Sequence, residues 1–238
     1  MKKNISVMGS QWGDEGKGKI IDIFAEKADV VVRSQGGNNA GHTVVNKDET
    51  YKLHLIPSGI LYKNKPCYIG AGVVIDPKSI LEEINGLTKR NISLNELKID
   101  YRAHIVMPYH IALDGLSEKL RGDSNIGTTN RGIGPCYMDK YERCGLRFYD
   151  LIHPEIFKEK AAPLINHKNK IITEIYNGQE LDADKIIAEY IEYGKQLKQF
   201  AADISVLTFE AAKAEKQILF EGAQATLLDI DFGTYPYV

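Results

Sequence analysis

The 238-residue chain lacks a strong excess of either charge: 30 lysines and arginines stand against 32 aspartates and glutamates, which gives a formal net charge of −2. A surface that binds nucleic acid or anionic lipid needs concentrated positive charge. The sequence also has no stripe of alternating basic and aromatic residues. We therefore expect neither nucleic acid nor a membrane as a partner.

Long apolar runs and paired cysteines are also missing. No run approaches the roughly 20 apolar residues of a membrane-spanning helix, and the basic start is followed by only a short apolar stretch, so no targeting segment is expected. The three cysteines, Cys67, Cys136 and Cys144, cannot all pair with one another and match no zinc-binding spacing. Reduced thiols in a cytoplasmic protein are therefore expected.

What the sequence does contain is an alternation of strand and helix patterns, with 43% hydrophobic residues to supply a core. Residues 4–8 are a short β-rich run, 19–28 have helical apolar spacing, and 29–33 are typical of a buried parallel strand. Together they have the length of a β-α-β unit. Further predicted elements are a hairpin over 43–45 and 50–55, strands at 67–69, 104–107 and 217–221, a helix from Pro77 to about 85 with Asp76 as N-cap, and a helix over 183–200.

This pattern predicts one α/β domain over residues 1–238, with a mostly parallel central sheet and flanking helices. Residues 121–136 are rich in glycine, threonine, asparagine and arginine, and we expect a functional loop there, ordered or mobile.

The first candidate site is the stretch GSQWGDEGKGK at residues 9–19, between a predicted strand and a predicted helix. Glycines let backbone amides approach a phosphate, and a helix N-terminus adds positive potential. Residues 13–19 match the G-x-x-x-x-G-K spacing of a nucleotide-binding P-loop, but Ile20 stands where that motif has a Mg²⁺-binding hydroxyl. Asp14 is the candidate metal ligand or general base. The alternative, a solvated charged turn, is disfavoured by the strand–loop–helix context.

The second candidate site is the stretch SQGGNNAGHT at residues 34–43. It follows the next predicted strand, where open α/β sheets build their sites. Its glycines permit close approach of a ligand, and its asparagines offer amide groups. Histidine is more often structural, but His42 lies in a glycine- and asparagine-rich loop, which favours a role as a cation or general acid. The other five histidines are expected to be structural or exposed.

With three later stretches, these two loops resemble the adenylosuccinate synthetase family. The later stretches are IGTTNRGIGP at 126–135, the pair Arg143 and Arg147, and FEGAQ at 220–224 followed by GTYP at 233–236. The resemblance implies a P-loop-like GTP-binding architecture in which residues 121–147 bind the 5′-phosphate of IMP. It also implies the family's reaction: GTP-dependent ligation of IMP and L-aspartate to adenylosuccinate, through 6-phosphoryl-IMP, with release of GDP and phosphate. This is the first committed step from IMP to AMP.

The resemblance further implies roles for individual residues. Asp14 would remove the N1 proton of IMP, His42 would stabilise the departing GDP, and Gln224 would hydrogen-bond the purine 6-oxygen. The implied Mg²⁺ ligands are Asp14 and the Gly41 carbonyl. The implied GTP-binding residues are Gly13, Asp14, Glu15, Gly16, Lys17, Gly18, Lys19, Gly41, His42 and Thr43. The implied IMP-binding residues are Asp14, Glu15, Gly16, Lys17, Asn39, Ala40, Gly41, His42, Thr129, Arg143 and Gln224.

A homodimer is implied as well, because the family's counterpart of Arg143 reaches the partner subunit's site. Without the resemblance, a surface salt bridge of Arg143 with Glu142 or Asp139 is the favoured interpretation. Asn130 stands where the family usually has glycine, so the loop needs either a left-handed asparagine or a small adjustment. Other departures from the family pattern are Cys136, Met138, Cys144, Ala225 and Phe232.

The family's members are considerably longer, and the sequence ends inside a motif that normally continues, so we expect a truncated chain. By resemblance, the remainder would bind aspartate, contact IMP through a further arginine and read guanine. A non-catalytic nucleotide-binding fragment is therefore the alternative to an active ligase. A different P-loop NTPase is disfavoured by Ile20 and by the absence of an N-K-x-D guanine motif.

Overall fold

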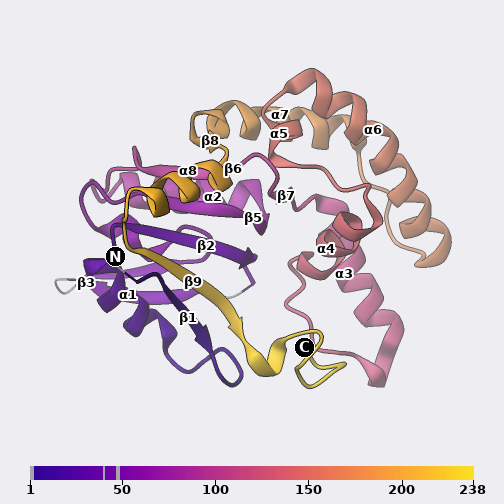
Figure 1. The fold of residues 1–238 in the computed structure, drawn as a ribbon. Coiled ribbons are helices and arrows are strands. Elements are labelled where there is room, and N and C mark those ends of the chain that lie inside the picture. Colours follow the sequence, from indigo (N-terminus) through magenta and orange to yellow (C-terminus); the bar gives the residue numbers. More distant parts are fainter. Residues whose placement is uncertain (1–2, 40, 47–48) are drawn as a thin grey trace.

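The computed structural model describes residues 3–39, 41–46 and 49–238 (Figure 1). In the hairpin it describes the backbone but not the side chains of His42, Val44, Val45, Asn46 and Glu49. Among the described helices, none is both long and apolar enough to cross a membrane.

A parallel sheet organises the chain and confirms the predicted α/β class. Within the described residues it has seven strands, which lie side by side in the order β1 (Ile5–Gly9), β9 (Ile218–Ala225), β2 (Val30–Gly36), β5 (Cys67–Ile75), β6 (Leu97–Asp100) and β8 (Ala201–Ala202), with β7 (His104–Ile105) paired to the end of β5. All of these pairings are parallel. A separate antiparallel hairpin joins β3 (His42–Asn46) and β4 (Glu49–Leu53).

The helices follow the strands along the chain. They are α1 (Lys17–Lys27), α2 (Pro77–Thr88), α3 (Pro108–Arg121), α4 (Ile133–Glu142), α5 (Phe148–Leu151), α6 (Pro154–Lys170), α7 (Ala183–Leu197) and α8 (Ile204–Lys213). Short 3₁₀ turns lie at Ser58–Leu61, Gly122–Ser124, Lys198–Phe200 and Thr226–Leu228, and a π-helical turn at Ile171–Ile175 extends α6.

Alternation along the central strands places apolar side chains on both faces of the sheet. Val31 of β2 and Ile69 of β5 belong to the core that α1 and α2 cover. Their neighbours Val32 and Tyr68 face the opposite way and pack with Ile204 of α8. Figure 1 shows α3 and α4 beyond the arrowheads of the central strands, so these helices lie at the carboxyl edge of the sheet.

Several predicted elements exist with different bounds. The strand predicted at 29–33 continues to Gly36, and the one at 217–221 continues to Ala225. Helix α1 begins at Lys17 rather than at residue 19, because Gly16 adopts a left-handed φ of 80° directly before it. The loop expected over residues 121–136 gives way to α4 at Ile133.

One strand was predicted too long, and one unit contains an inserted strand. The strand expected at 104–107 stops at Ile105, because Met107 is the N-cap of α3 and Pro108 starts that helix. The predicted β-α-β unit is present as β1, α1 and β2, although its two strands are not neighbours in the sheet. Strand β9 lies between β1 and β2 and pairs with both.

Gly194 marks a close contact between α7 and the end of α5. A Cβ at this position would overlap the carbonyl oxygen of Leu151, which is backbone and cannot rotate away. We expect Gly194→Ala to lower the free energy of unfolding by about 1–3 kcal/mol, because overpacking outweighs the helix propensity of alanine. Urea unfolding of the purified variant measures this.

The matched control is Gly86→Ala in α2, where a Cβ would meet nothing within 4 Å. Here the propensity of alanine acts alone, so the free energy of unfolding should rise by up to about 1 kcal/mol. Equal effects of the two substitutions would show that the contact with Leu151 does not govern Gly194.

Candidate active site

The loop after β1 leads into α1 through two glycines with left-handed backbone, Gly13 (φ 93°) and Gly16 (φ 80°). These φ values favour glycine over any residue with a side chain. Gly16 is the N-cap of α1, and no side chain caps this helix. The Lys19 amide donates to the Gly16 carbonyl oxygen at 3.1 Å, which leaves the amides of Lys17 and Gly18 for another acceptor. An anion is the acceptor that helix N-termini favour.

A cavity of about 280 Å³ lies beside this loop and is formed by three strand–loop junctions. These are the loop after β1, the segment between β2 and β3, and the end of β9. Eight of the residues predicted to bind GTP or IMP line it: Gly13, Asp14, Gly16, Lys17, Gly18, Gly41, Thr43 and Gln224. The structure thus brings together residues up to about 200 positions apart in the chain.

Lys17 and Glu15 interact within the first loop. The Lys17 ammonium donates to the Gly13 carbonyl oxygen at 3.2 Å and lies 3.5 Å from the Glu15 carboxylate. The Gln11 amide donates to the same carboxylate at 2.6 Å. Hydrogen bonds from the backbone amides of Glu15 itself, Gln11 and Gly13 lower the pKa of Glu15 to about 2. A bound phosphate would compete with this carboxylate for loop amides and for Lys17.

The end of β9 is hydrogen-bonded to the second loop. Gln224, with a left-handed φ of 55°, donates from Nε2 to Asn39 Oδ1 at 3.0 Å. Gln35 Nε2 donates to the Ala223 carbonyl oxygen at 2.9 Å. These contacts hold the Gln224 side chain at the cavity, beside residues that the second loop supplies.

Helix α4 and the loop before it support the second loop from the other side. The Gly36 amide donates to the Tyr137 hydroxyl at 3.0 Å, and that hydroxyl donates to the Gly72 carbonyl oxygen at 2.6 Å. Arg131 donates to the Asn38 carbonyl oxygen at 3.0 Å. The glycine-rich loop at 126–132 and the second loop therefore form one connected unit.

Comparison with known proteins agrees with this geometry. Residues 6–238 match the family model for adenylosuccinate synthetase. The chain belongs to the adenylosuccinate synthetase family. Over 232 residues it is 57% identical to adenylosuccinate synthetase of Thermoanaerobacter pseudethanolicus and 56% identical to that of Acetivibrio thermocellus. Each alignment covers 98% of this chain, and 54% and 55% of the two relatives, so the chain spans about half of their length.

Two solved structures have the same fold. The fully ligated enzyme from Plasmodium falciparum matches with a TM-score of 0.90 and 42% identity, over 99% of this chain and 55% of that one. A cyanophage succinoaminodeoxyadenylate synthetase matches with a TM-score of 0.61 at 20% identity and shares the fold alone.

Not all residues that the family resemblance implies line the cavity. Glu15, Lys19 and Asn39 are close in the sequence to residues that line the cavity, but they do not line it themselves. Thr129 is exposed in the 126–132 loop, and Arg143 is exposed at the far end of α4. Ala40 and the side chain of His42 lie outside the described residues.

Arg143 follows the last residue of α4 and has a left-handed φ of 68°. Helix α4 has ten residues, so about 15 Å separate Arg143 from the 126–132 loop. The described ion pairs include none between Arg143 and Glu142 or Asp139; Asp139 instead pairs with His110 and Lys168. The salt-bridge interpretation of Arg143 was therefore wrong.

Sequence reasoning missed two charged residues in the cavity wall, Arg33 and Glu221. They are opposite each other in β2 and β9 and are 3% exposed each. Arg33 donates to the carbonyl oxygens of Gly37, at 2.7 Å, and His54, while Glu221 accepts from the Ser58 amide at 3.1 Å. Burial lowers the pKa of Arg33, and the Glu221 and Glu83 carboxylates act in the opposite direction. A charged residue inside an apolar strand was the signal available in the sequence.

Four of the residues that depart from the family pattern, Asn130, Cys136, Met138 and Phe232, can be located in the structure. Asn130 has a left-handed backbone, with a φ of 54°. The three cysteines are free, and Cys136 is buried where α4 packs against β7. Met138 and Phe232 are strongly exposed.

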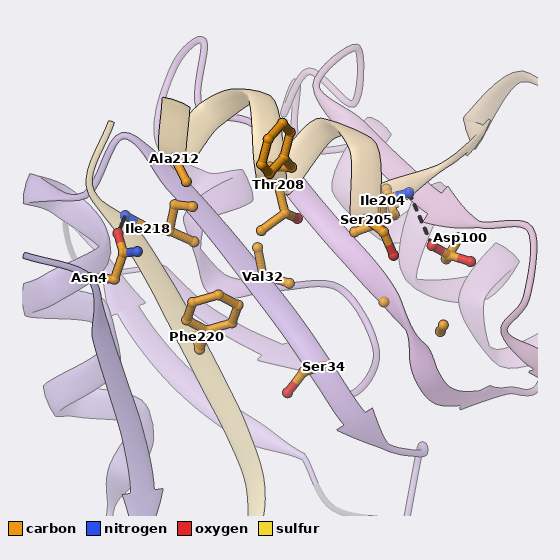
Figure 2. A pocket seen from close by; sticks show the side chains of 13 residues that line it. Asn4, Val32, Ser34, Asp100, Ile204, Ser205, Thr208, Ala212, Ile218 and Phe220 are labelled. Carbon is orange, nitrogen blue, oxygen red and sulfur yellow. Dashed lines mark hydrogen bonds between the residues drawn. The ribbon is translucent and has the colours of Figure 1, made fainter. Parts of the chain in front are cut away.

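A second, larger cavity of about 460 Å³ lies between α8 and the sheet (Figure 2). Val32 and Phe220 of the sheet lie on one side of it and Thr208 of α8 on the other. Its lining includes Ser34 and Phe220 from the candidate stretches, but none of the residues predicted to bind GTP, IMP or Mg²⁺. The Asp100 carboxylate at its end already accepts from the Ile204 amide, at 3.0 Å. A mostly apolar groove of this kind does not offer the convergent polar groups that a nucleotide phosphate needs.

Proposed function

We propose that the chain carries the nucleotide-binding machinery of a GTP-dependent ligase that joins IMP and L-aspartate to give adenylosuccinate, with release of GDP and phosphate. The observation that carries this proposal is that Asp14, Lys17, Gly41 and Gln224, from three separate junctions at the carboxyl edge of the sheet, line one cavity. Membership of the adenylosuccinate synthetase family supports the assignment of substrates.

The proposed reaction has two steps. In the first, Asp14 takes the N1 proton of IMP, the 6-oxygen attacks the γ-phosphorus of GTP, and the bond to the bridging oxygen breaks as GDP leaves. In the second, the amine of aspartate displaces phosphate from 6-phosphoryl-IMP. Phosphoryl transfer depends mainly on positioning and on stabilisation of charge. We assign these tasks to the loop amides and Lys17, to His42 on the GDP side, and to Gln224 at the 6-oxygen.

The residues present fit a magnesium ion. Asp14 and Gly41 both line the cavity and both offer oxygen, the donor that Mg²⁺ prefers. When bound, the ion would offset the charge of the phosphate oxygens.

We further propose that Asn39, Thr129 and Arg143 bind the 5′-phosphate of IMP, with Arg143 acting in the site of the partner subunit of a homodimer. Support comes from the exposure of Arg143 and from its separation from the chain's own 126–132 loop by the length of α4. Residues 121–147 would then form the IMP-phosphate region of a single domain.

The test begins with calorimetric titration of the 238-residue chain with IMP and with Mg²⁺–GTP, followed by an assay of adenylosuccinate formation with aspartate present. Binding with turnover supports the full ligase. Binding without turnover supports the alternative, a nucleotide-binding fragment. Binding of neither ligand by the folded chain would contradict both.

Lys17→Met provides a residue-specific prediction. Loss of a charged donor to the GTP phosphates should weaken the binding of Mg²⁺–GTP about 10- to 100-fold, because hydrogen bonds to charged groups contribute about 1.5–3 kcal/mol. Lys27→Met in the last turn of the same helix removes an exposed lysine outside the cavity and should leave the affinity unchanged. Equal affinities of the two variants for Mg²⁺–GTP would exclude Lys17 from the phosphate site.

A further inference from the structure

Helix α3 presents two carboxylates to the 126–132 loop. Asp114 and Glu118 are four residues apart and so lie on one face of the helix. Glu118 Oε2 accepts from the amides of Gly127 at 2.8 Å and Ile126 at 3.1 Å, with a longer contact to the Thr128 amide at 3.4 Å. The Glu118 side chain thus accepts hydrogen bonds from three consecutive backbone amides at the start of the loop.

Asp114 holds the other end of the loop. Its Oδ2 accepts from the Gly132 amide at 2.9 Å, and the residue is only 5% exposed. Gly132 is the N-cap of α4, with a left-handed φ of 71°. The two carboxylates therefore fix both the entry of the loop and the point where α4 begins.

The contacts with the loop lower the pKa of the Glu118 carboxylate, which favours its charged form. Burial raises its pKa, but hydrogen bonds from the Gly127, Ile126 and Thr128 amides and from Arg121 lower it further, so the net shift is downward. Arg121 donates to Glu118 Oε1 at 2.8 Å and balances the charge.

This arrangement restricts which atoms of the loop can meet a phosphate. Phosphate-binding loops commonly use backbone amides, but here the amides of residues 126–128 and of Gly132 already donate to α3. Arg131 donates to the second loop. The arc between the two held ends contains Thr129 and Asn130, and both are exposed.

We propose that Glu118, assisted by Asp114, is a positioning residue that fixes the 126–132 loop so that Thr129, and not the amides of residues 126–128 or of Gly132, receives the phosphate of a nucleoside monophosphate. The inference rests on the proposed function, because it takes IMP as the ligand. Glu118 itself does not touch the ligand; it acts through the loop it holds.

The experiment compares Glu118→Ala and Glu118→Gln with a control, Glu159→Ala, which removes an exposed glutamate from α6. Calorimetry with IMP should show a loss of affinity of about 10-fold for Glu118→Ala, a smaller loss for Glu118→Gln, which keeps an acceptor oxygen, and no change for Glu159→Ala. Hydrogen exchange should become faster at the amides of residues 126–128 in the two Glu118 variants only.

A double-mutant cycle with Thr129→Val separates positioning from general destabilisation. If Glu118 acts through Thr129, Glu118→Ala should add little to the loss that Thr129→Val causes alone. Losses that multiply, or a Glu118→Ala variant that binds IMP like the wild type, would overturn the inference while leaving the proposed function intact. If Glu118→Ala does not fold, the Glu118→Gln variant carries the same cycle. Failure of the wild-type chain to bind IMP would instead overturn the proposed function, and the inference with it.

Discussion

Replacing Asp14 by asparagine is expected to slow adenylosuccinate formation by about 10²- to 10⁴-fold, which is the usual contribution of a positioned general base. Asparagine has the same shape but accepts no proton at neutral pH. Asp14 lines the cavity that Lys17, Gly41 and Gln224 also line, so the substitution removes a base and a metal ligand without changing the volume of the site. The measurement is kcat in the presence of IMP, GTP, Mg²⁺ and aspartate, beside the affinity for IMP.

Asp184→Asn is the matched control, since it makes the same chemical change at an exposed position in the first turn of α7. It should leave kcat unaffected. Undiminished turnover by the Asp14→Asn variant would remove Asp14 from the proposed chemistry. If the wild-type chain binds but does not turn over, the prediction moves to binding: Asp14→Asn should weaken Mg²⁺–GTP more than GTP without the ion, because a neutral amide is a poorer ligand for a hard cation.

The first two loops of the site could be predicted from local sequence alone. A short strand, a glycine-rich loop with Lys17 and a helix in succession specify a phosphate loop, and the actual α1 begins within two residues of its predicted start. The β-branched residues Val30 to Val32 likewise predict strand β2, although the strand continues beyond them to Gly36, where a left-handed φ of 86° starts the turn. These features depend on residues close together in the sequence, where propensity and spacing carry the information.

The third junction could not be predicted in this way. Strand β9 inserts between β1 and β2, and nothing in the spacing of residues 4–33 shows that a gap is left for it. Gln224 reaches Asn39, 185 residues earlier, only because of this insertion. Gln224 was identified from the family resemblance. Arg33 and Glu221 lie in two mostly apolar strands, and only the register of β2 with β9 shows that they are opposite each other.

The helical layer beside the sheet was also largely missed. Helix α6 contains Pro163 and has polar residues around much of its surface, which obscures the helical period. What orders this layer instead is a buried charge network. Asp139 of α4 accepts from His110 of α3 at 3.0 Å and from Lys168 of α6 at 2.5 Å. Asp139 and the Lys168 side chain are 3% and 8% exposed.

Asp139→Asn is therefore expected to lower the free energy of unfolding by about 3–5 kcal/mol, because the buried Lys168 ammonium keeps only the exposed Glu142 carboxylate, 3.8 Å away, as a countercharge. Lys195→Met is the control: Lys195 of α7 pairs with Glu192 at 2.5 Å, but the two side chains are 58% and 62% exposed, so its loss should change stability by at most about 1 kcal/mol. Urea unfolding at neutral pH measures both. A change below about 1 kcal/mol for Asp139→Asn would show that the network does not hold the three helices together.

The stabilisation that Asp139 provides should depend on pH. Burial raises the pKa of Asp139, but His110 and Lys168 lower it further, and the net shift is downward. Its stabilisation is therefore present above the pKa of an unfolded aspartate, about 3.9, and is lost as the pH falls through the lower folded-state value. The difference in the free energy of unfolding between wild type and Asp139→Asn should become smaller in that acidic range.

A double variant, Asp139→Leu with Lys168→Met, removes both charges and should recover part of the stability that either change alone loses. Recovery of stability without recovery of IMP affinity would show that the network's geometry, and not only its stability, places α4 and the phosphate loop before it.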